Sequence, residues 1–147
     1  MSQNQCNLRD KALRIGDEYN NLILSMSRIS DDFLRALSES GIDATRDLIE
    51  SRSFLCMELV QCGETLKPLV QELERSGAAD DELRRLLADI RSNLLVLNEK
   101  QRTCETALSA RMDQCRADLL ALNQHSGLRR TYHGSREQDA RFLDSMR

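Results

Sequence analysis

The fold of this chain is decided by residues 8–33, which read LRDKALRIGDEYNNLILSMSRISDDF. Apolar side chains recur in this stretch at alternating intervals of four and three residues. These positions are Leu8, Ala12, Ile15, Tyr19, Leu22, Met26, Ile29 and Phe33. Because an α-helix has 3.6 residues per turn, this spacing puts all of them on one face. The stretch therefore predicts an amphipathic helix over about residues 6–40, which ends at Ser40-Gly41.

Two later segments repeat the same spacing. The first consists of Leu48, Arg52, Leu55, Leu59, Cys62, Leu66, Leu69 and Leu73. The second consists of Leu83, Leu87, Ile90, Leu94, Leu97, Gln101, Cys104 and Leu108, and it resumes after a stutter as Met112, Cys115, Leu119 and Leu122. They predict helices over about residues 44–75 and 80–123, with Asp80 as the N-cap of the latter.

Three residues interrupt these patterns. Pro68 lies inside the second helix, where it lacks a backbone donor and crowds the previous turn, so we expect a kink near residues 64–67. Arg52 and Gln101 occupy apolar positions. They are either polar residues that set the register of the helices or residues at the edge of the bundle, where a head group reaches water.

The connections over residues 41–43 and 76–79 are short, which makes sequential helices antiparallel neighbours. We therefore predict an all-α fold, an antiparallel bundle of three long amphipathic helices with a short C-terminal helical tail. The bundle is expected over residues 1–125. Residues 126–147 are expected to form a mobile basic tail, in which a capping box at Ser135–Gln138 permits a short helix over 136–146.

The predicted helices differ in length. At a rise of 1.5 Å per residue, the third is about 15 Å longer than the others. Its end carries Met112, Cys115, Leu119 and Leu122, which we call the C-terminal stripe. An apolar stripe without a partner marks an interaction surface. We expect Phe142, Leu143 and Met146 of the tail to cover this stripe when it is empty or to clamp a bound partner.

Composition and motifs argue against catalysis and against several classes of ligand. The chain has 147 residues, 40% of them hydrophobic and 3% aromatic, with a net charge of −3. Adjacent pairs such as Asp31-Asp32 point to different helix faces, whereas catalytic carboxylates must converge. Cys115, His125 and His133 have no tight ligand spacing. We expect no enzyme activity, no cofactor and no metal.

Charged, apolar and cysteine residues also bear on nucleic-acid binding and on localisation. The basic cluster around Tyr132, with Arg129, Arg130, His133 and Arg136, is too small for a dedicated nucleic-acid binder. No apolar run is long enough to insert in a membrane. The five cysteines are an odd number without a CxxC pair, which is typical of reduced thiols in a cytoplasmic protein.

Residues 94–134 carry a resemblance to a known family. Leu94-Leu-Val-Leu-Asn98, the amphipathic run to Leu122 and Tyr132-His-Gly134 resemble the C-terminal half of the FlgN-type flagellar export chaperones. Ser51-Arg52, followed by leucines at 55 and 59, is similar to their middle helix. The related FliT-type chaperones are the nearest alternative.

The resemblance implies a cytoplasmic type III export chaperone. Such a protein binds the helical terminal segments of hook–filament junction subunits, prevents their premature assembly and delivers them to a component of the export gate. It implies that the C-terminal stripe is the client groove and that Tyr132 is a tail contact. The alternative is a structural coiled-coil adaptor or self-associating helical protein, in which the same stripe pairs two copies as a homodimer.

Overall fold

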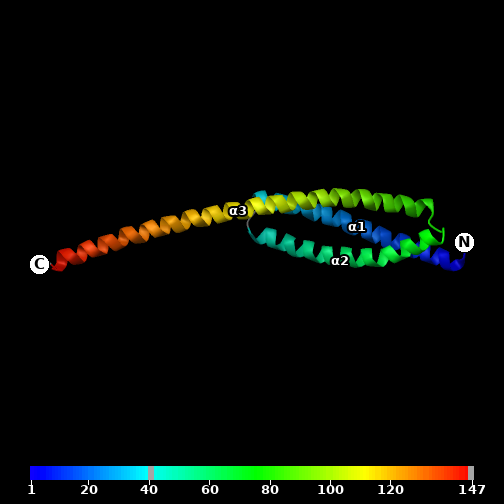
Figure 1. The fold of residues 1–147 in the computed structure, drawn as a ribbon, viewed down its shortest axis with the longest axis horizontal. Coiled ribbons are helices and arrows are strands. Elements are labelled where there is room, and N and C mark those ends of the chain that lie inside the picture. The colour runs from blue at the N-terminus through cyan, green and yellow to red at the C-terminus, as the bar shows by residue number, and fades with distance from the viewer. Residues whose placement is uncertain (40–41, 146–147) are drawn as a thin grey trace. The chain divides into compact units, whose positions relative to one another are not determined.

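The computed structural model of the chain consists of three long helices in the order α1, α2, α3 (Figure 1). They span Gln3–Glu39, Ile42–Arg75 and Asp81–Ser145. The structure describes residues 1–39 and 42–145, and it describes side-chain burial for residues 1–39 and 43–127. This part of the chain contains no strand, so the predicted all-α class is confirmed. None of its helices is both long and apolar enough to cross a membrane.

The chain divides into two compact units, Met1–Ala107 and Leu108–Arg147. The first unit contains α1, α2 and residues 81–107 of α3, and the second contains the rest of α3. The predicted bundle over residues 1–125 was therefore too long. Its end follows from burial, because Cys104 is the last buried residue of α3 in the described range.

The first helix begins three residues earlier than predicted because a capping box extends its N-terminus. The spacing of apolar residues does not reveal this capping box. The Ser2 main-chain N–H donates to Gln5 Oε1 at 2.9 Å, and the Gln5 N–H donates to Ser2 Oγ at 3.3 Å. This reciprocal pair satisfies donors that the first turn of a helix leaves free. The Ser-x-x-Gln spacing at residues 2–5 was the available signal.

The connection between α2 and α3 has the predicted termini. The Ala78 N–H donates to the Leu73 carbonyl at 2.9 Å, and the Gly77 N–H donates to the Glu74 carbonyl at 3.2 Å. This is a Schellman motif, and Gly77 adopts the left-handed conformation that it requires, with φ of 70°. Asp80 then caps α3, since its Oδ1 accepts the Leu83 N–H at 3.0 Å.

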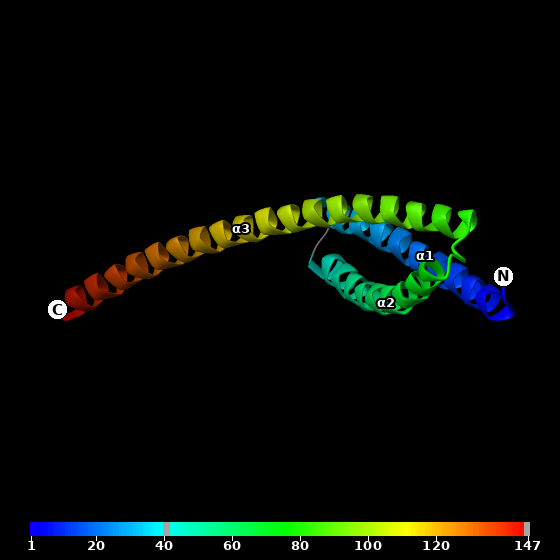
Figure 2. The same cartoon turned by 45° about the vertical axis from the view of Figure 1, so that its right-hand side comes forward.

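Within the first unit, α1 and residues 81–107 of α3 run in the same direction, and α2 runs against both (Figure 2). Contacts along the two parallel segments show this order, because Arg9 pairs with Asp80, and Asp31 pairs with Lys100 further along. In the part of the chain whose burial is described, the buried hydrophobic core has one aromatic member, Phe33, and otherwise consists of aliphatic and sulfur-containing side chains. Its members include Ala12, Ile15, Ile23, Met26, Phe33, Leu66, Leu73, Leu83, Ile90, Leu97 and Cys104.

The residues from Leu8 to Cys104 that recur at intervals of four and three face the interior of the first unit, as the spacing predicts. Every one of them from Leu8 to Leu108 is buried or half-buried. Two helices approach each other closely at Gly16, where an added Cβ would come within 2.7 Å of Leu86 Cδ2. Glycine therefore allows α3 to pack directly against the α1 backbone, which the spacing of apolar residues does not reveal.

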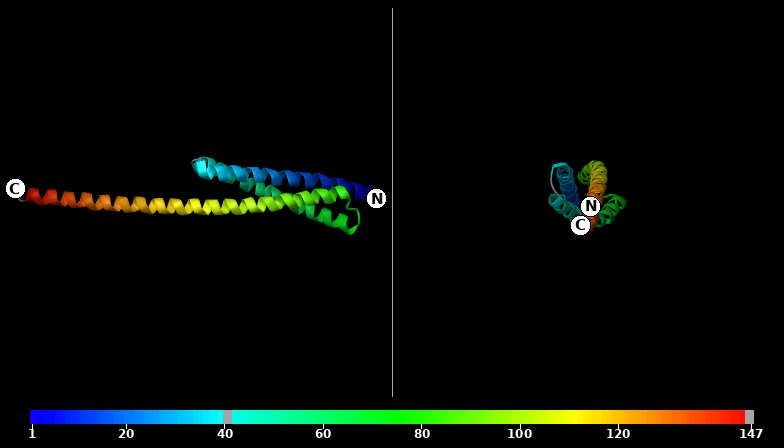
Figure 3. Two further views of the ribbon diagram at one scale, coloured as in Figure 1. Left: turned by 90° about the horizontal axis from the view of Figure 1, so that it is seen from above. Right: turned by 90° about the vertical axis from the view of Figure 1, so that its left-hand side faces the viewer.

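Pro68 does not break α2, which is continuous from Ile42 to Arg75. The ribbon of α2 curves in Figure 2, and in the view from above in Figure 3 it crosses α3 obliquely. A proline inside a helix removes one main-chain hydrogen bond, and bending is the usual response.

The predicted separation of the tail from the third helix was wrong, because the helical backbone is continuous there. Residues 126–145 continue α3, so the helix does not end at Asn123 and no separate helix begins at 136. Gly127 and Gly134 cost only about 1 kcal/mol each in a helix interior, and no proline follows Pro68. Local helical hydrogen bonds therefore persist through both glycines. Met146 lies outside the described residues.

Candidate functional site

The C-terminal stripe lies in the second unit, where α3 is the only described element. Met112, Leu119 and Leu122 are 48%, 59% and 63% exposed, and Cys115 is also exposed. All side chains from Ser109 to Gly127 are exposed. A single helix cannot cover its own apolar face, so this unit leaves the whole stripe open.

Charges beside the stripe balance one another. Residues 108–127 contain Arg111 and Arg116 against Asp113 and Asp118. Arg116 pairs with Asp113 at 3.8 Å, and Gln114 Nε2 donates to Asp118 Oδ1 at 3.0 Å. Exposed contacts of this kind contribute little stability. Recognition at the stripe would therefore depend mainly on burial of apolar area.

The predicted tail contacts are placed only by their backbone. Tyr132, Phe142 and Leu143 lie on the continuous α3 helix. The positions of their side chains lie outside the described residues, as does Met146. Whether they cover or clamp the stripe stays a prediction.

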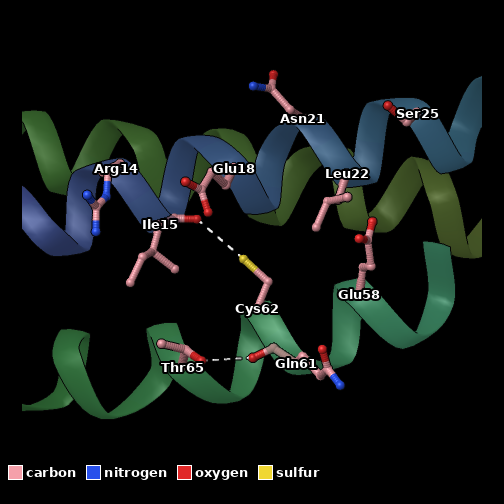
Figure 4. Close-up of a pocket in the computed structure, with 10 residues that line it drawn as sticks. All are labelled: Arg14, Ile15, Glu18, Asn21, Leu22, Ser25, Glu58, Gln61, Cys62 and Thr65. Carbon is pink, nitrogen blue, oxygen red and sulfur yellow. Dashed lines mark hydrogen bonds between the residues drawn. The ribbon is translucent and has the colours of Figure 1, made fainter. Parts of the chain in front are cut away.

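A cleft of about 650 Å³ lies between α1 and α2 in the first unit (Figure 4). Ile15 and Leu22 point toward α2 in this view, and the Cys62 thiol donates to the Ile15 carbonyl at 3.6 Å. Burial raises the pKa of Cys62, and the nearby Glu18 carboxylate raises the pKa further. A raised pKa lowers the reactivity of a thiol as a nucleophile.

Cys104, the other cysteine at an apolar position of the pattern, is buried more completely than Cys62. Cys104 is 1% exposed and donates to the Ser30 carbonyl at 3.5 Å. Burial raises its pKa, an effect that the nearby Arg52 partly opposes. Cys104 is thus a small core residue, as predicted, whereas Cys62 is half-buried.

Cys115, His125 and His133 were the residues weighed as metal ligands in the sequence, and the structure describes the side chains of the first two. Cys115 and His125 are ten positions apart on α3, about 15 Å along the helix. The His133 side chain lies outside the described residues. Among the residues that are described, no group of three or more His, Cys, Asp or Glu side chains could hold a metal ion.

Arg52 and Gln101, the two polar residues that occupy apolar positions of the pattern, contact each other. Arg52 Nη2 donates to Gln101 Oε1 at 2.6 Å, which joins α2 to α3. The guanidinium also lies over the Phe33 ring, 5.2 Å from its centroid. Such cation–π contacts stabilise a partly buried arginine. The half-buried Arg52 therefore joins α2 to both α1 and α3, and whether the pair sets the register of the helices stays a prediction.

Polar contacts between α1 and α3 were not predicted. Arg9 bonds both Asp80 and Glu82, and Asn93 Nδ2 donates to Asn20 Oδ1 at 2.8 Å. Lys100 Nζ donates to Asp31 Oδ2 at 2.8 Å. These partners are separated by about seventy positions in the sequence, and each residue alone is a typical surface residue. Sequence spacing carried no signal for them.

Comparison with protein-family models, with curated proteins and with solved structures finds no match to this chain.

Proposed function

We propose that this protein is a cytoplasmic export chaperone of the FlgN type. It binds the amphipathic terminal helices of flagellar hook–filament junction subunits, and it keeps them from assembling before they reach the export gate. The observation that carries the proposal is the C-terminal stripe, because its unit consists of one helix that cannot bury it. The resemblance of residues 94–134 supplies the class of client.

The client and the C-terminal stripe would each present an apolar helix face that lacks a partner. The terminal helix of an assembling subunit is amphipathic and has no partner for its apolar face until assembly. Pairing it with Met112, Cys115, Leu119 and Leu122 would bury both faces in a helix-to-helix mode. Each fully buried side chain of this size contributes about 1.5 to 3 kcal/mol, and ordering and association offset much of the sum. We expect affinities in the micromolar range, which permit release at export.

The test uses synthetic peptides that correspond to the terminal helices of junction subunits from the native host, titrated into the full chain by calorimetry. Leu119→Glu should weaken binding by at least about tenfold, because it puts a charge into the apolar contact. Leu120→Glu is the matched control, since Leu120 is 64% exposed on the same helix but is not part of the stripe. Equal losses in both variants would remove the stripe as the binding face.

Light scattering separates this proposal from the alternative. We expect a monomer that forms a 1:1 complex with its client. A stable homodimer that Leu119→Glu dissociates would contradict the chaperone and identify a self-associating coiled-coil protein.

A further inference from the structure

The first unit has an apolar face of its own that is not closed. In the N-terminal half of α2, residues 43–60 include no buried side chain, whereas Leu66 and Leu73 of the other half are 5% and 0% exposed. Ile49, Met57 and Val60 are 42%, 64% and 53% exposed. Three large apolar side chains within three turns of one helix form a patch that water contacts unfavourably.

A groove between this half of α2 and α3 adjoins the patch. Its volume is about 350 Å³, and its apolar walls come from Ile49, Cys56 and Leu59 of α2 and from Met26 and Leu97. A second hollow of about 490 Å³ on α2 shares Ser53 and Cys56 with it and extends to Val60. The two hollows together follow α2 from residue 49 to residue 61. At 1.5 Å per residue this is about 18 Å, a length that suits a helix better than a small molecule.

A positive charge lines the groove without a counter-charge. Arg52 contributes to its wall, and no Asp or Glu is among the lining residues. Arg52 forms no ion pair with any residue in the described part of the chain. Its Nε is buried and has no hydrogen-bond partner there, although Nη2 is bonded to Gln101. A partly buried guanidinium without a counter-charge is costly, and a carboxylate placed beside it in the groove would offset that cost.

We propose that this α2–α3 groove is a second docking site, which takes an amphipathic helix of another protein that carries an Asp or Glu among its apolar anchors. The apolar anchors fill the groove walls, and the carboxylate pairs with Arg52. Because the site lies in the first unit, it depends neither on the C-terminal stripe nor on a flagellar client.

Charge favours a different protein over a second copy of this chain as the occupant. The stripe of another copy would bring Arg111 and Arg116 together with Asp113 and Asp118, a balanced set of charges that offers Arg52 no net negative charge. A helix whose acidic residue has no partner gains more from Arg52, because ion pairing strengthens as neighbouring apolar groups exclude water.

The experiment uses three fluorescein-labelled helical peptides of about three heptads, with leucine at the seam positions and a central Glu, Gln or Lys beside the seam. Anisotropy is measured as each is titrated with the full chain. The Glu peptide should bind about five- to tenfold more tightly than the Gln peptide, and the Lys peptide should bind most weakly. Arg52→Met keeps the apolar stem and should abolish the preference for Glu. Arg46→Met is the matched control, since Arg46 is an exposed arginine of α2 outside the groove.

A second measurement guards against loss of folding. The Nε–H resonance of Arg52, assigned by its absence in Arg52→Met, should shift when the Glu peptide is added and much less with the Gln peptide. Circular dichroism of Arg52→Met should match that of the wild type.

Several outcomes would overturn the proposal. They are equal affinity for the three peptides, a Glu preference that survives Arg52→Met, and no binding of any peptide. A wild-type dimer that Arg52→Met dissociates, together with competition by a peptide of residues 108–127, would assign the groove to a second copy instead. The titrations are repeated with Leu119→Glu, which disables the C-terminal stripe. The preference for the Glu peptide should persist in this variant, so this proposal and the one for the C-terminal stripe can fail separately.

Discussion

Two stretches of the same helix, residues 81–107 and 109–127 of α3, carry similar residues at similar spacing and differ in burial. In the first, Ile90, Leu97 and Cys104 are at most 8% exposed. In the second, Met112 and Leu119 are 48% and 59% exposed. The periodicity of apolar residues identifies which side chains share a face. It does not reveal whether anything covers that face, because coverage depends on elements that are distant in the sequence.

The largest expected difference between the two stretches is in thiol reactivity. Single-cysteine variants that retain only Cys104 or only Cys115 are compared by their rates of labelling with a thiol reagent. Cys104 should react at least about 100-fold more slowly, because labelling requires local opening and burial raises its pKa. In concentrated denaturant the two rates should converge. Similar rates in the native state would show that residues near 104 are not packed.

Truncation of leucine should give the next largest difference. Leu83 is 0% exposed and Leu122 is 63% exposed. Leu83→Ala should lower the free energy of unfolding by about 2 to 5 kcal/mol, because it leaves a cavity in the core. Leu122→Ala should change it by less than about 0.5 kcal/mol. Urea denaturation monitored by circular dichroism measures both, and comparable losses would refute the division of α3 into a packed and an open part.

The smallest expected effect concerns the acid dependence of stability at the start of α3. The Leu83 N–H and the Arg9 guanidinium hold the pKa of Asp80 below its usual value. A carboxylate with a lowered folded pKa stabilises the protein above its unfolded pKa of about 3.9, and this contribution disappears as the pH falls through the folded pKa. Asparagine also caps helices, so Asp80→Asn removes the charge while keeping the cap.

We therefore expect the wild type to be more stable than Asp80→Asn at neutral pH, with the difference closing as the pH falls below about 4. Urea midpoints across the pH range measure this. Asp113→Asn, which replaces an exposed carboxylate of the second unit, is the control and should track the wild type. A difference between wild type and Asp80→Asn that persists at low pH would show that the pairing with Arg9 is not electrostatic.

Much of the fold could be predicted because helices form through local contacts. The Schellman turn at Gly77 and the cap at Asp80 each involve residues within five positions. The same local rule also explains the error at the C-terminus. The predicted helix ended at about residue 123, but the cost of each glycine at 127 and 134 is too small to end a helix without a competing structure.

The two candidate sites also differ in whether local sequence is enough to reveal them. The C-terminal stripe could be found by its spacing, since all four residues lie on one helix. The α2–α3 groove could not, because its walls come from segments about fifty positions apart, such as Arg52 and Gln101. Arg52 was marked only as an interruption, and its unmet Nε donor became visible when the surrounding helices were placed.

The amino-acid sequence by itself determined the helices, their caps and the face that each turns to its neighbours, because these depend on hydrogen bonds and periodicity within a few residues. Tertiary structure alone decided that Gly16 admits Leu86 against α1 and that Arg52 reaches Gln101 and Phe33. It also decided that Cys104 is the last buried residue of α3 up to residue 127, where the description of burial ends. The reason is that burial and charge pairing are properties of surfaces brought together in space, and residue spacing along one helix does not encode them.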